Sequence, residues 1–188
     1  MGTRKQVEWR NNMIIQSIYH SPIGELLIAV NDDVLLGVWM KDQKYYKQNI
    51  NEEMKHDDQH KIIMQTKSWL DRYFCNEKPP IDELHLAPVG TPFRKDVWDI
   101  LMRIPYGQVI TYQDIARQIA KAKGIKRMSA QAIGGAVGHN PISIIIPCHR
   151  VVGTNGSLTG YAGGIEKKIA LLQHEQVDMQ NLFVPKDV

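Results

Sequence analysis

Cysteine is scarce in this chain of 188 residues, which contains only Cys75 and Cys148 and no CxxC pair. This scarcity argues against a disulfide framework and favours free, reduced thiols. Long apolar runs are also missing, since none approaches the roughly 20 residues that a membrane-spanning helix needs. The segment MGTRKQVEWRNN has no apolar signal region behind its basic residues. We therefore expect a cytoplasmic protein without a membrane segment, long enough for one domain or two small ones.

The net charge of the chain is small, at +3, but the charged residues are unevenly distributed along it. Residues 1–88 contain 11 Lys and Arg against 13 Asp and Glu, whereas residues 89–188 contain 12 against 7. The basic half also contains Cys148. A positive balance of this size is compatible with a polyanionic partner, although it is also common on surfaces that bind none.

The first half of the chain predicts a small unit of strands and one helix. Three short apolar stretches, 13–20, 25–30 and 34–40, have strand character and are separated by turn-forming residues. Residues 41–60 are polar and are expected to form a loop. Apolar side chains at helical spacing then predict a helix over 62–74.

Two helix starts follow in the second half. Thr91 is suited to cap a helix that has Pro92 in its first position, and apolar residues over 97–104 predict the buried face of that helix. Thr111 is suited to cap a second helix that reaches Ala120. This second helix and a third segment over 129–138, joined by a short connector that contains glycine, predict a helix-turn-helix.

A basic connector over 121–127 leads to a third helix over 129–138, whose side chains are nearly all small. Each glycine inside a helix costs roughly 0.5–1 kcal/mol relative to alanine, so this composition needs a reason. Tight packing against another helix is one explanation. The other is a helix that enters a nucleic-acid groove, with the cations of the connector on phosphates. The candidate DNA-contacting residues are Ser129, Ala130, Gln131, Gly134, Gly135, Lys121, Lys123, Lys126 and Arg127.

The stretch IIIPCHRVVG, residues 144–153, places a thiol and two basic side chains after three isoleucines that predict a buried strand. A thiol of pKa about 8.5 is only a few per cent ionised at neutral pH, so a reactive Cys148 needs a base or a positive field. His149 could supply the base and Arg150 the field. Adjacent residues of an extended chain point to opposite faces, so a water and a carboxylate that orients the imidazole would complete the relay. A structural Cys-His pair is the alternative.

No metal site is predicted. His56 and His60 have the i, i+4 spacing of a metal-binding pair, but they lie in a polar segment without a third ligand at metal-site spacing. Cys75 follows a helix end and has no base nearby in the sequence, so we expect its thiol to be inert.

The motif IPCHRVVG resembles the active-site motif of the O6-alkylguanine-DNA alkyltransferases, also called methylated-DNA–protein-cysteine methyltransferases. TPFRKDVWDILMRIPYGQVITYQDIA and GGAVGHNP precede it, and GYAGGIEKKIALLQHE follows it, so order and spacing match over about residues 90–176. The resemblance implies an α+β fold. Residues 1–88 would form a small ribonuclease-H-like α/β domain, and residues 89–188 a helical domain with a winged helix-turn-helix. It further implies a monomer that acts on DNA without a cofactor.

The resemblance also implies a single-turnover methyltransferase that repairs double-stranded DNA. Cys148 would attack the alkyl carbon on O6 of a flipped guanine, or on O4 of thymine. His149 would take the thiol proton through a water, Glu175 would orient His149, and Tyr112 would donate a hydrogen bond to the leaving base. The strand over 144–146 would then end where Cys148 faces an open pocket.

The same resemblance assigns a substrate pocket and a groove-binding helix. Asn140 would tie that helix to the strand that carries Cys148, and the small side chains would fit a minor groove only about 6 Å wide. Two departures concern polar contacts, because the family commonly has an arginine finger where this chain has Gln131 and a serine where it has Ala162. The implied pocket residues are Asn140, Tyr161, Ala162, Gly163 and Val151.

Two other functions remain open. A thiol hydrolase would use Cys148, His149 and Glu175 as a triad and would turn over acyl substrates, whereas alkyl transfer consumes one protein molecule per lesion. A non-catalytic, lesion-sensing DNA-binding protein would lack the acceptor cysteine, so the presence of Cys148 argues against it.

Overall fold

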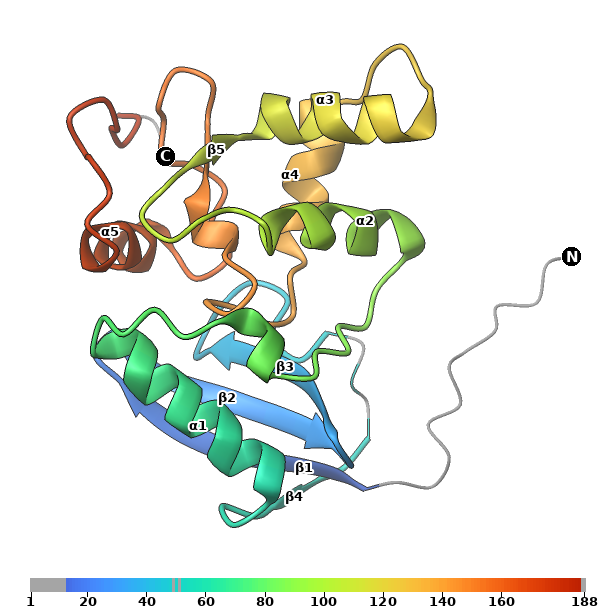
Figure 1. The fold of residues 1–188 in the computed structure, drawn as a ribbon, viewed down its shortest axis with the longest axis vertical. Helices are drawn as coiled ribbons and strands as arrows, with labels where there is room; N and C mark the ends of the chain where they lie inside the picture. Colours follow the sequence, from blue (N-terminus) through green and yellow to red (C-terminus); the bar gives the residue numbers. More distant parts are fainter. Residues whose placement is uncertain (1–12, 49, 51, 187–188) are drawn as a thin grey trace, which may run out of the picture.

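The computed structural model describes residues 13–48, 50 and 52–186. Figure 1 shows a twisted sheet with helix α1 (Lys61–Phe74) across one face and the other helices grouped beyond the edge that strand β3 (Val34–Met40) forms. This α+β arrangement agrees with the predicted fold class. In the described residues, no helix is long and apolar enough to cross a membrane.

Four strands form the sheet: β1 (Ile14–Ser21), β2 (Gly24–Asn31), β3 (Val34–Met40) and β4 (Met54–His56). Their order is β3-β2-β1-β4, with β4 parallel to β1 and the other pairs antiparallel. The three longer strands confirm the predictions over 13–40. The prediction of a loop throughout 41–60 is wrong at β4, because pairing with the edge of β1 gives Met54, Lys55 and His56 a strand conformation that the polar sequence around them does not favour.

Helix α1 (Lys61–Phe74) covers the sheet and confirms the helix predicted over 62–74. The side chain of His60 accepts a hydrogen bond from the N–H of Ile62 and thereby caps the helix. A short 3₁₀ helix, η1 (Ile81–Glu83), and a bridge between Leu35 and Leu86 then hold the connecting segment against β3. The buried face of α1 consists of Ile62, Ile63, Thr66, Trp69, Leu70 and Tyr73.

The second part begins with three α-helices: α2 (Pro92–Leu101), α3 (Tyr112–Lys123) and α4 (Ala130–Gly138). Thr91 caps α2, and Thr111 forms a complete capping box with α3, as predicted. Helix α4 packs against both α2 and α3. The α3–α4 pair is the predicted helix-turn-helix.

The basic connector is shorter than predicted. Helix α3 continues through Lys123 and ends at Gly124, whose φ of 64° is the left-handed conformation favoured at helix C-termini. Lys121 and Lys123 therefore belong to the last turn of a helix, where cations interact favourably with the helix dipole. Only the cations Lys126 and Arg127 remain in the connector.

The predicted strand over residues 144–146 is wrong. These isoleucines are buried, but they form turns in which Ile144 has a φ of 74°. A short apolar run does not distinguish a buried strand from a buried turn, because both remove the side chains from water. The edge of β3 decides the outcome here, since Val38 hydrogen-bonds to the backbone of Pro141 and Ser143 at 2.9 Å each.

The segment that follows these turns leads to the remaining elements: η2 (Cys148–Arg150), β6 (Val151–Val152) and α5 (Ile165–His174). Strand β6 pairs in parallel with β5 (Ile110–Thr111), which immediately precedes α3. This pairing brings Tyr112 at the start of α3 close to the segment that follows Cys148.

Candidate active site

Asn140 fixes the turn that carries Cys148. Its amide nitrogen donates to the carbonyl of Ile146 at 2.8 Å and to the sulfur of Cys148 at 3.1 Å. Its amide oxygen accepts a hydrogen bond from the N–H of Ile142 at 3.0 Å. Asn140 thus ties the end of α4 to the thiol, as predicted, except that Cys148 lies on the 3₁₀ helix η2 rather than on a strand.

Cys148 is buried rather than facing an open pocket, because only 4% of its surface is exposed. Burial raises the pKa of its thiol, although the hydrogen bond from Asn140 and the positive charge of Lys168 oppose that effect. The thiol is therefore protonated in the free protein at neutral pH. The expectation of an open pocket is wrong for this state, and a substrate base must displace surrounding groups to reach the sulfur.

His149 lies next to the thiol on η2 and is completely buried. Its Nε2 is 2.6 Å from Oε1 of Glu175, so Nε2 carries the proton of the neutral ring and Nδ1 is an acceptor. Burial lowers the pKa of His149, and the hydrogen bond to Glu175 partly offsets this effect. In the described part of the chain, Nδ1 has no hydrogen-bond partner and no hydrogen bond joins His149 to Cys148. A bridging water is needed for proton transfer between them.

Glu175 caps the C-terminus of α5 and has a completely buried side chain that accepts several hydrogen bonds. Arg150 donates to both of its oxygens, from Nε at 2.7 Å and from Nη2 at 2.9 Å, and Tyr73 donates to Oε1 at 2.7 Å. Burial alone would raise the pKa of Glu175, but His149 and Arg150 hold it well below its usual range. Since His149 is neutral at pH 7, the fixed charge of Arg150 is the main reason at that pH.

Arg150 therefore has a different role from the one expected. Its guanidinium binds Glu175 in a bidentate manner and donates from Nη1 to the carbonyl of Ile104 at 2.6 Å. The charge is paired with the carboxylate instead of being directed at the thiol of Cys148. It keeps Glu175 ionised and fixed in a buried site.

The wall of the site comes from α3 and from the loop before α5. The hydroxyl of Tyr112 donates to the carbonyl of Thr159 at 3.1 Å. Burial and the nearby Cys148 raise the pKa of Tyr112 to about 12, so this hydroxyl is a donor at neutral pH. A Cβ at Gly163 would lie 2.4 Å from the sulfur of Met40 and 2.9 Å from the ring of Tyr161, so any other residue would force these side chains to move.

Two other predicted pocket residues act through their backbone. The carbonyl of Ala162 accepts a hydrogen bond from the N–H of Lys44 at 3.0 Å, which joins the loop to the sheet part of the molecule. Val151 is buried in β6, and its carbonyl accepts a hydrogen bond from Lys168 at 2.5 Å. Tyr161, which is half-buried, completes the predicted set beside Met40, with its hydroxyl 3.8 Å from the Met40 sulfur.

Comparison with known proteins identifies the family. Residues 92–177 match the DNA binding domain of the 6-O-methylguanine DNA methyltransferases, and residues 14–88 match their ribonuclease-like domain. The methylated-DNA–protein-cysteine methyltransferase of Salmonella typhimurium is 37% identical over 161 residues, which are 82% of this chain and 91% of that protein. The chain belongs to the 6-O-methylguanine DNA methyltransferase family.

Other relatives agree with this assignment. The methylated-DNA–protein-cysteine methyltransferase of Methanosarcina acetivorans is 40% identical over 85% of this chain and 96% of its own length. The crystal structure of Mycobacterium tuberculosis OGT in complex with DNA superposes with a TM-score of 0.76, at 40% identity, covering 86% of this chain and 92% of that one. The family predicted from the motifs is confirmed, and with it the enzyme class.

In this methyltransferase family member, the first turns of α4, which are predicted to bind a DNA groove, are largely exposed. Ser129 caps the helix, and Ala130, Gln131 and Gly135 are exposed. A Cβ at Gly135 would meet nothing within 4 Å, so internal packing does not explain this glycine. Gly134 differs, because it is half-buried and a Cβ added there would lie 3.9 Å from the ring of Tyr112, which is an ordinary van der Waals contact.

The predicted cations of the methyltransferase do not form one equivalent set. Lys121, Lys126 and Arg127 are exposed and line a groove of about 540 Å³ beside α3. Lys123, in contrast, is 2.6 Å from a carboxylate oxygen of Asp96 on α2. We therefore expect its charge to be less available to a phosphate.

Lys168 is a residue of the site that the sequence analysis missed. Its buried ammonium donates to the carbonyls of Val151 at 2.5 Å and Thr159 at 3.0 Å, and burial lowers its pKa to about 8. A clue was present in the sequence, because Lys168 lies one helical turn before Leu171 and Leu172 on the buried face of α5. Tyr73 was missed as well, and no local pattern connects it with a carboxylate 102 residues later.

Proposed function

We propose that this chain repairs alkylated DNA by transferring the alkyl group from O6 of guanine, or O4 of thymine, to the sulfur of Cys148. One observation supports this assignment of residues above the others. Cys148 receives a hydrogen bond from Asn140, and its neighbour His149 is bound through Nε2 to the buried carboxylate of Glu175 and has an unpartnered Nδ1. This arrangement is typical of an activated nucleophile.

In the proposed reaction, a water carries the thiol proton of Cys148 to Nδ1 of His149. The resulting thiolate attacks the alkyl carbon, a C–S bond forms, and the C–O bond breaks with its electron pair going to guanine. The charge-assisted pair with Glu175 stabilises the imidazolium that forms. No step regenerates the thiol, so each protein molecule reacts once.

Tyr112 is proposed to stabilise the departing base. Its hydroxyl now donates to the carbonyl of Thr159 and would exchange this partner for the guanine ring as negative charge develops there. The base must first leave the DNA stack, which costs a few kcal/mol and least for a weakly paired lesion. The exposed face of α4, with Gln131 near its start, is proposed to bind the minor groove.

We further propose that the boundary between the two domains lies between residues 88 and 89, after the bridge that joins Leu86 to β3 and before the cap of α2. We also propose a cytoplasmic location. The two cysteines, which are not joined in a disulfide, are compatible with it.

Intact-protein mass spectrometry after incubation with duplex DNA containing O6-methylguanine tests the assignment. We expect the mass of one methyl group per protein molecule, mapped to Cys148. Cys148→Ala should gain no mass while still binding DNA, and Cys75→Ala is the matched control that should gain it normally. A methyl group on any other residue would contradict the proposal. Catalytic turnover of a thioester without protein methylation would instead favour the thiol hydrolase.

A further inference from the structure

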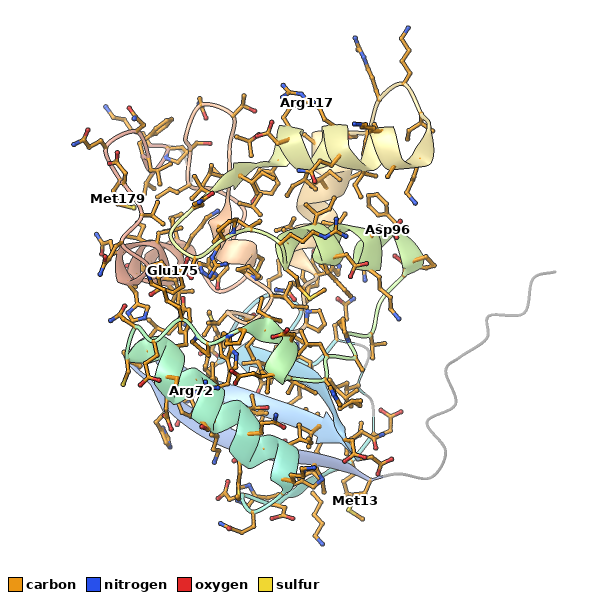
Figure 2. All side chains as sticks on the ribbon, in the orientation of Figure 1. Met13, Arg72, Asp96, Arg117, Glu175 and Met179 are labelled. Carbon is orange, nitrogen blue, oxygen red and sulfur yellow. The ribbon has the colours of Figure 1, made fainter. Side chains whose placement is uncertain are left out.

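Tyr73 reaches the proposed site from the other part of the molecule. It lies in the last turn of α1, is only 1% exposed, and donates its hydroxyl proton to Oε1 of Glu175 at 2.7 Å. Figure 2 shows Glu175 beside this end of α1, between the sheet and the C-terminal helices. The same oxygen, Oε1, binds Nε2 of His149 at 2.6 Å. One oxygen therefore joins Tyr73 to the imidazole next to Cys148.

We propose that Tyr73 is a positioning residue for alkyl transfer, whose hydroxyl holds Oε1 of Glu175 and limits how strongly this carboxylate stabilises the imidazolium of His149. The inference rests on the proposed function, because it assumes that His149 receives the thiol proton. Glu175 would then be set by two domains, with Arg150 donating from η2 and Tyr73 donating from α1.

The hydroxyl of Tyr73 has the properties that this role requires. Burial and the negative charge of Glu175 raise the pKa of Tyr73 well above its usual range, so the hydroxyl remains a donor at every working pH. Its ring is held by Trp69, with centroids 5.6 Å apart, and by Phe74 at 5.1 Å. Packing therefore prevents the hydroxyl from following the carboxylate if Glu175 moves.

The expected electrostatic effect has a definite sign. Every hydrogen bond that a carboxylate accepts stabilises its charge and reduces its ability to attract a further proton. Loss of the Tyr73 hydroxyl leaves Glu175 a stronger acceptor toward His149. The pKa of His149 should then rise, so that His149 is protonated, and unable to act as a base, over a wider range of acidic pH.

Other ionisable groups face the same atoms and must be separated from this effect. Arg150, Lys168 and Cys148 surround His149, and Tyr106 lies near Glu175. His174, on α5, binds the carbonyl of Tyr73 through its Nε2 at 2.9 Å. Since His174 is a second ionisable group in contact with Tyr73, a rate profile alone is ambiguous, and the titration of His149 must be observed directly.

The test compares Tyr73→Phe with the wild-type chain by single-turnover rates on O6-methylguanine duplex and by NMR titration of the assigned His149 ring nitrogens. We expect a rate about three- to tenfold lower at neutral pH, because one hydrogen bond that fixes the relay is lost. The acid limb of the rate profile and the His149 titration should both move to higher pH by roughly half a unit or more.

Tyr19→Phe is the matched control. Tyr19 also donates to a carboxylate at 2.7 Å, in this case Asp71 on α1, and its ring stacks on Phe74 at 6.5 Å, but among the described residues it donates no hydrogen bond to Glu175 or His149. We expect unchanged rates and an unchanged His149 titration in this variant. If Tyr73 served only to stabilise the fold, Tyr73→Phe would unfold more readily but would leave the His149 titration in place, and that result would overturn the inference.

A second variant keeps the hydroxyl and covers the case in which Tyr73→Phe does not fold. 3-Fluorotyrosine at residue 73 is a stronger donor, so the His149 titration should move to lower pH, and no movement would also overturn the inference. A failure of the proposed function would give different results. His149→Gln would then react as fast as the wild-type chain, or the methyl group would be found on a residue other than Cys148.

Discussion

Lys168 places an ammonium group where water cannot reach it, with two backbone carbonyls as acceptors and no carboxylate bound to it in the described chain. Its pKa of about 8 in the folded protein lies below the value of 10.5 for an ordinary lysine. Between these values the unfolded chain binds more protons than the folded one. The folded state is therefore penalised below about pH 8 and loses that penalty as pH rises toward 10.5.

We predict that the free energy of unfolding of the wild-type chain, relative to that of Lys168→Met, rises by on the order of 3 kcal/mol between about pH 8 and pH 10.5. Urea unfolding of both proteins across this range measures the difference. The comparison is needed because burial raises the pKa of Cys148 in the folded protein, which lowers stability as pH rises and so opposes the effect of Lys168. Parallel pH dependences of the two proteins would mean that Lys168 ionises normally in the folded state.

Gln131 is exposed in the first turn of α4, at the position proposed to fill the space of an extruded base. An uncharged amide holds such a state less firmly than a planar guanidinium. We predict that Gln131→Arg binds lesion-containing duplex several-fold more tightly and that Gln131→Ala loses both affinity and repair rate on duplex. Single-turnover rates on single-stranded DNA should not change, because nothing has to be unpaired there. Equal losses of Gln131→Ala on both substrates would assign residue 131 to the pocket or the fold.

Within helix α4, substitutions of Gly135 should affect the stability of the fold and the affinity for DNA in different ways. It lies inside α4 with open space where a Cβ would be, so Gly135→Ala should raise the free energy of unfolding by about 0.5–1 kcal/mol. Gly135→Leu should also fold, but it should bind duplex DNA at least tenfold more weakly than the wild-type chain, because the added side chain meets the groove wall. Ala122→Leu, on an exposed position of α3, is the control for adding an apolar group to the surface.

Thermal unfolding and DNA-binding titrations of these three variants give the two quantities independently. If Gly135→Leu binds DNA as tightly as the wild-type chain, the small face of α4 does not enter the groove. Close packing would not explain the glycines either, because a Cβ at Gly134 would lie no closer than 3.9 Å to another atom and a Cβ at Gly135 would meet nothing within 4 Å.

The cations around the end of α3 should differ in their effect on DNA binding. We predict that Lys126→Ala and Arg127→Ala each reduce the salt slope of binding by about one unit, since each exposed cation neutralises one phosphate. Lys123→Ala should change the slope less, because Asp96 pairs with Lys123 in the free protein. Affinities measured at several salt concentrations decide between these outcomes. If every variant has the same salt slope as the wild-type chain, these cations do not contact phosphates and are ordinary solvated surface residues.

At the scale of the whole molecule, the two parts share one core. The largest buried cluster contains Leu26 and Val38 of the sheet together with Trp98 of α2, Ile133 of α4 and Ile142 of the turn before Cys148. In the same region, β3 hydrogen-bonds to the backbone of that turn. The surroundings of the thiol are thus built from both parts of the chain.

We predict that the molecule unfolds in a single cooperative transition and that Ile142→Ala lowers the free energy of unfolding by about 2–5 kcal/mol. Ile142 is completely buried, so the substitution leaves a cavity at the junction between the parts. Coincident transitions by far-UV circular dichroism and tryptophan fluorescence check the cooperativity. Two separated transitions would show that the parts unfold independently.

Sequence patterns alone were sufficient for the features that depend on neighbouring residues. Turn residues and apolar stretches located β1, β2 and β3, and Thr91 and Thr111 located the starts of two helices. The motif around Cys148 identified the family and the reaction. These inferences hold because strand alternation, helical periodicity and capping act over a few residues of chain.

Tertiary structure decided what depends on distant residues. Ile144 forms a turn because the edge of β3 pairs with the segment beside it, and the thiol of Cys148 is buried because several elements close around it. Glu175 accepts a hydrogen bond from Tyr73, which lies 102 residues earlier in the chain, and the lowered pKa of Lys168 depends on burial. Local patterns do not contain these contacts, since burial and electrostatics depend on which surfaces pack together after the chain has folded.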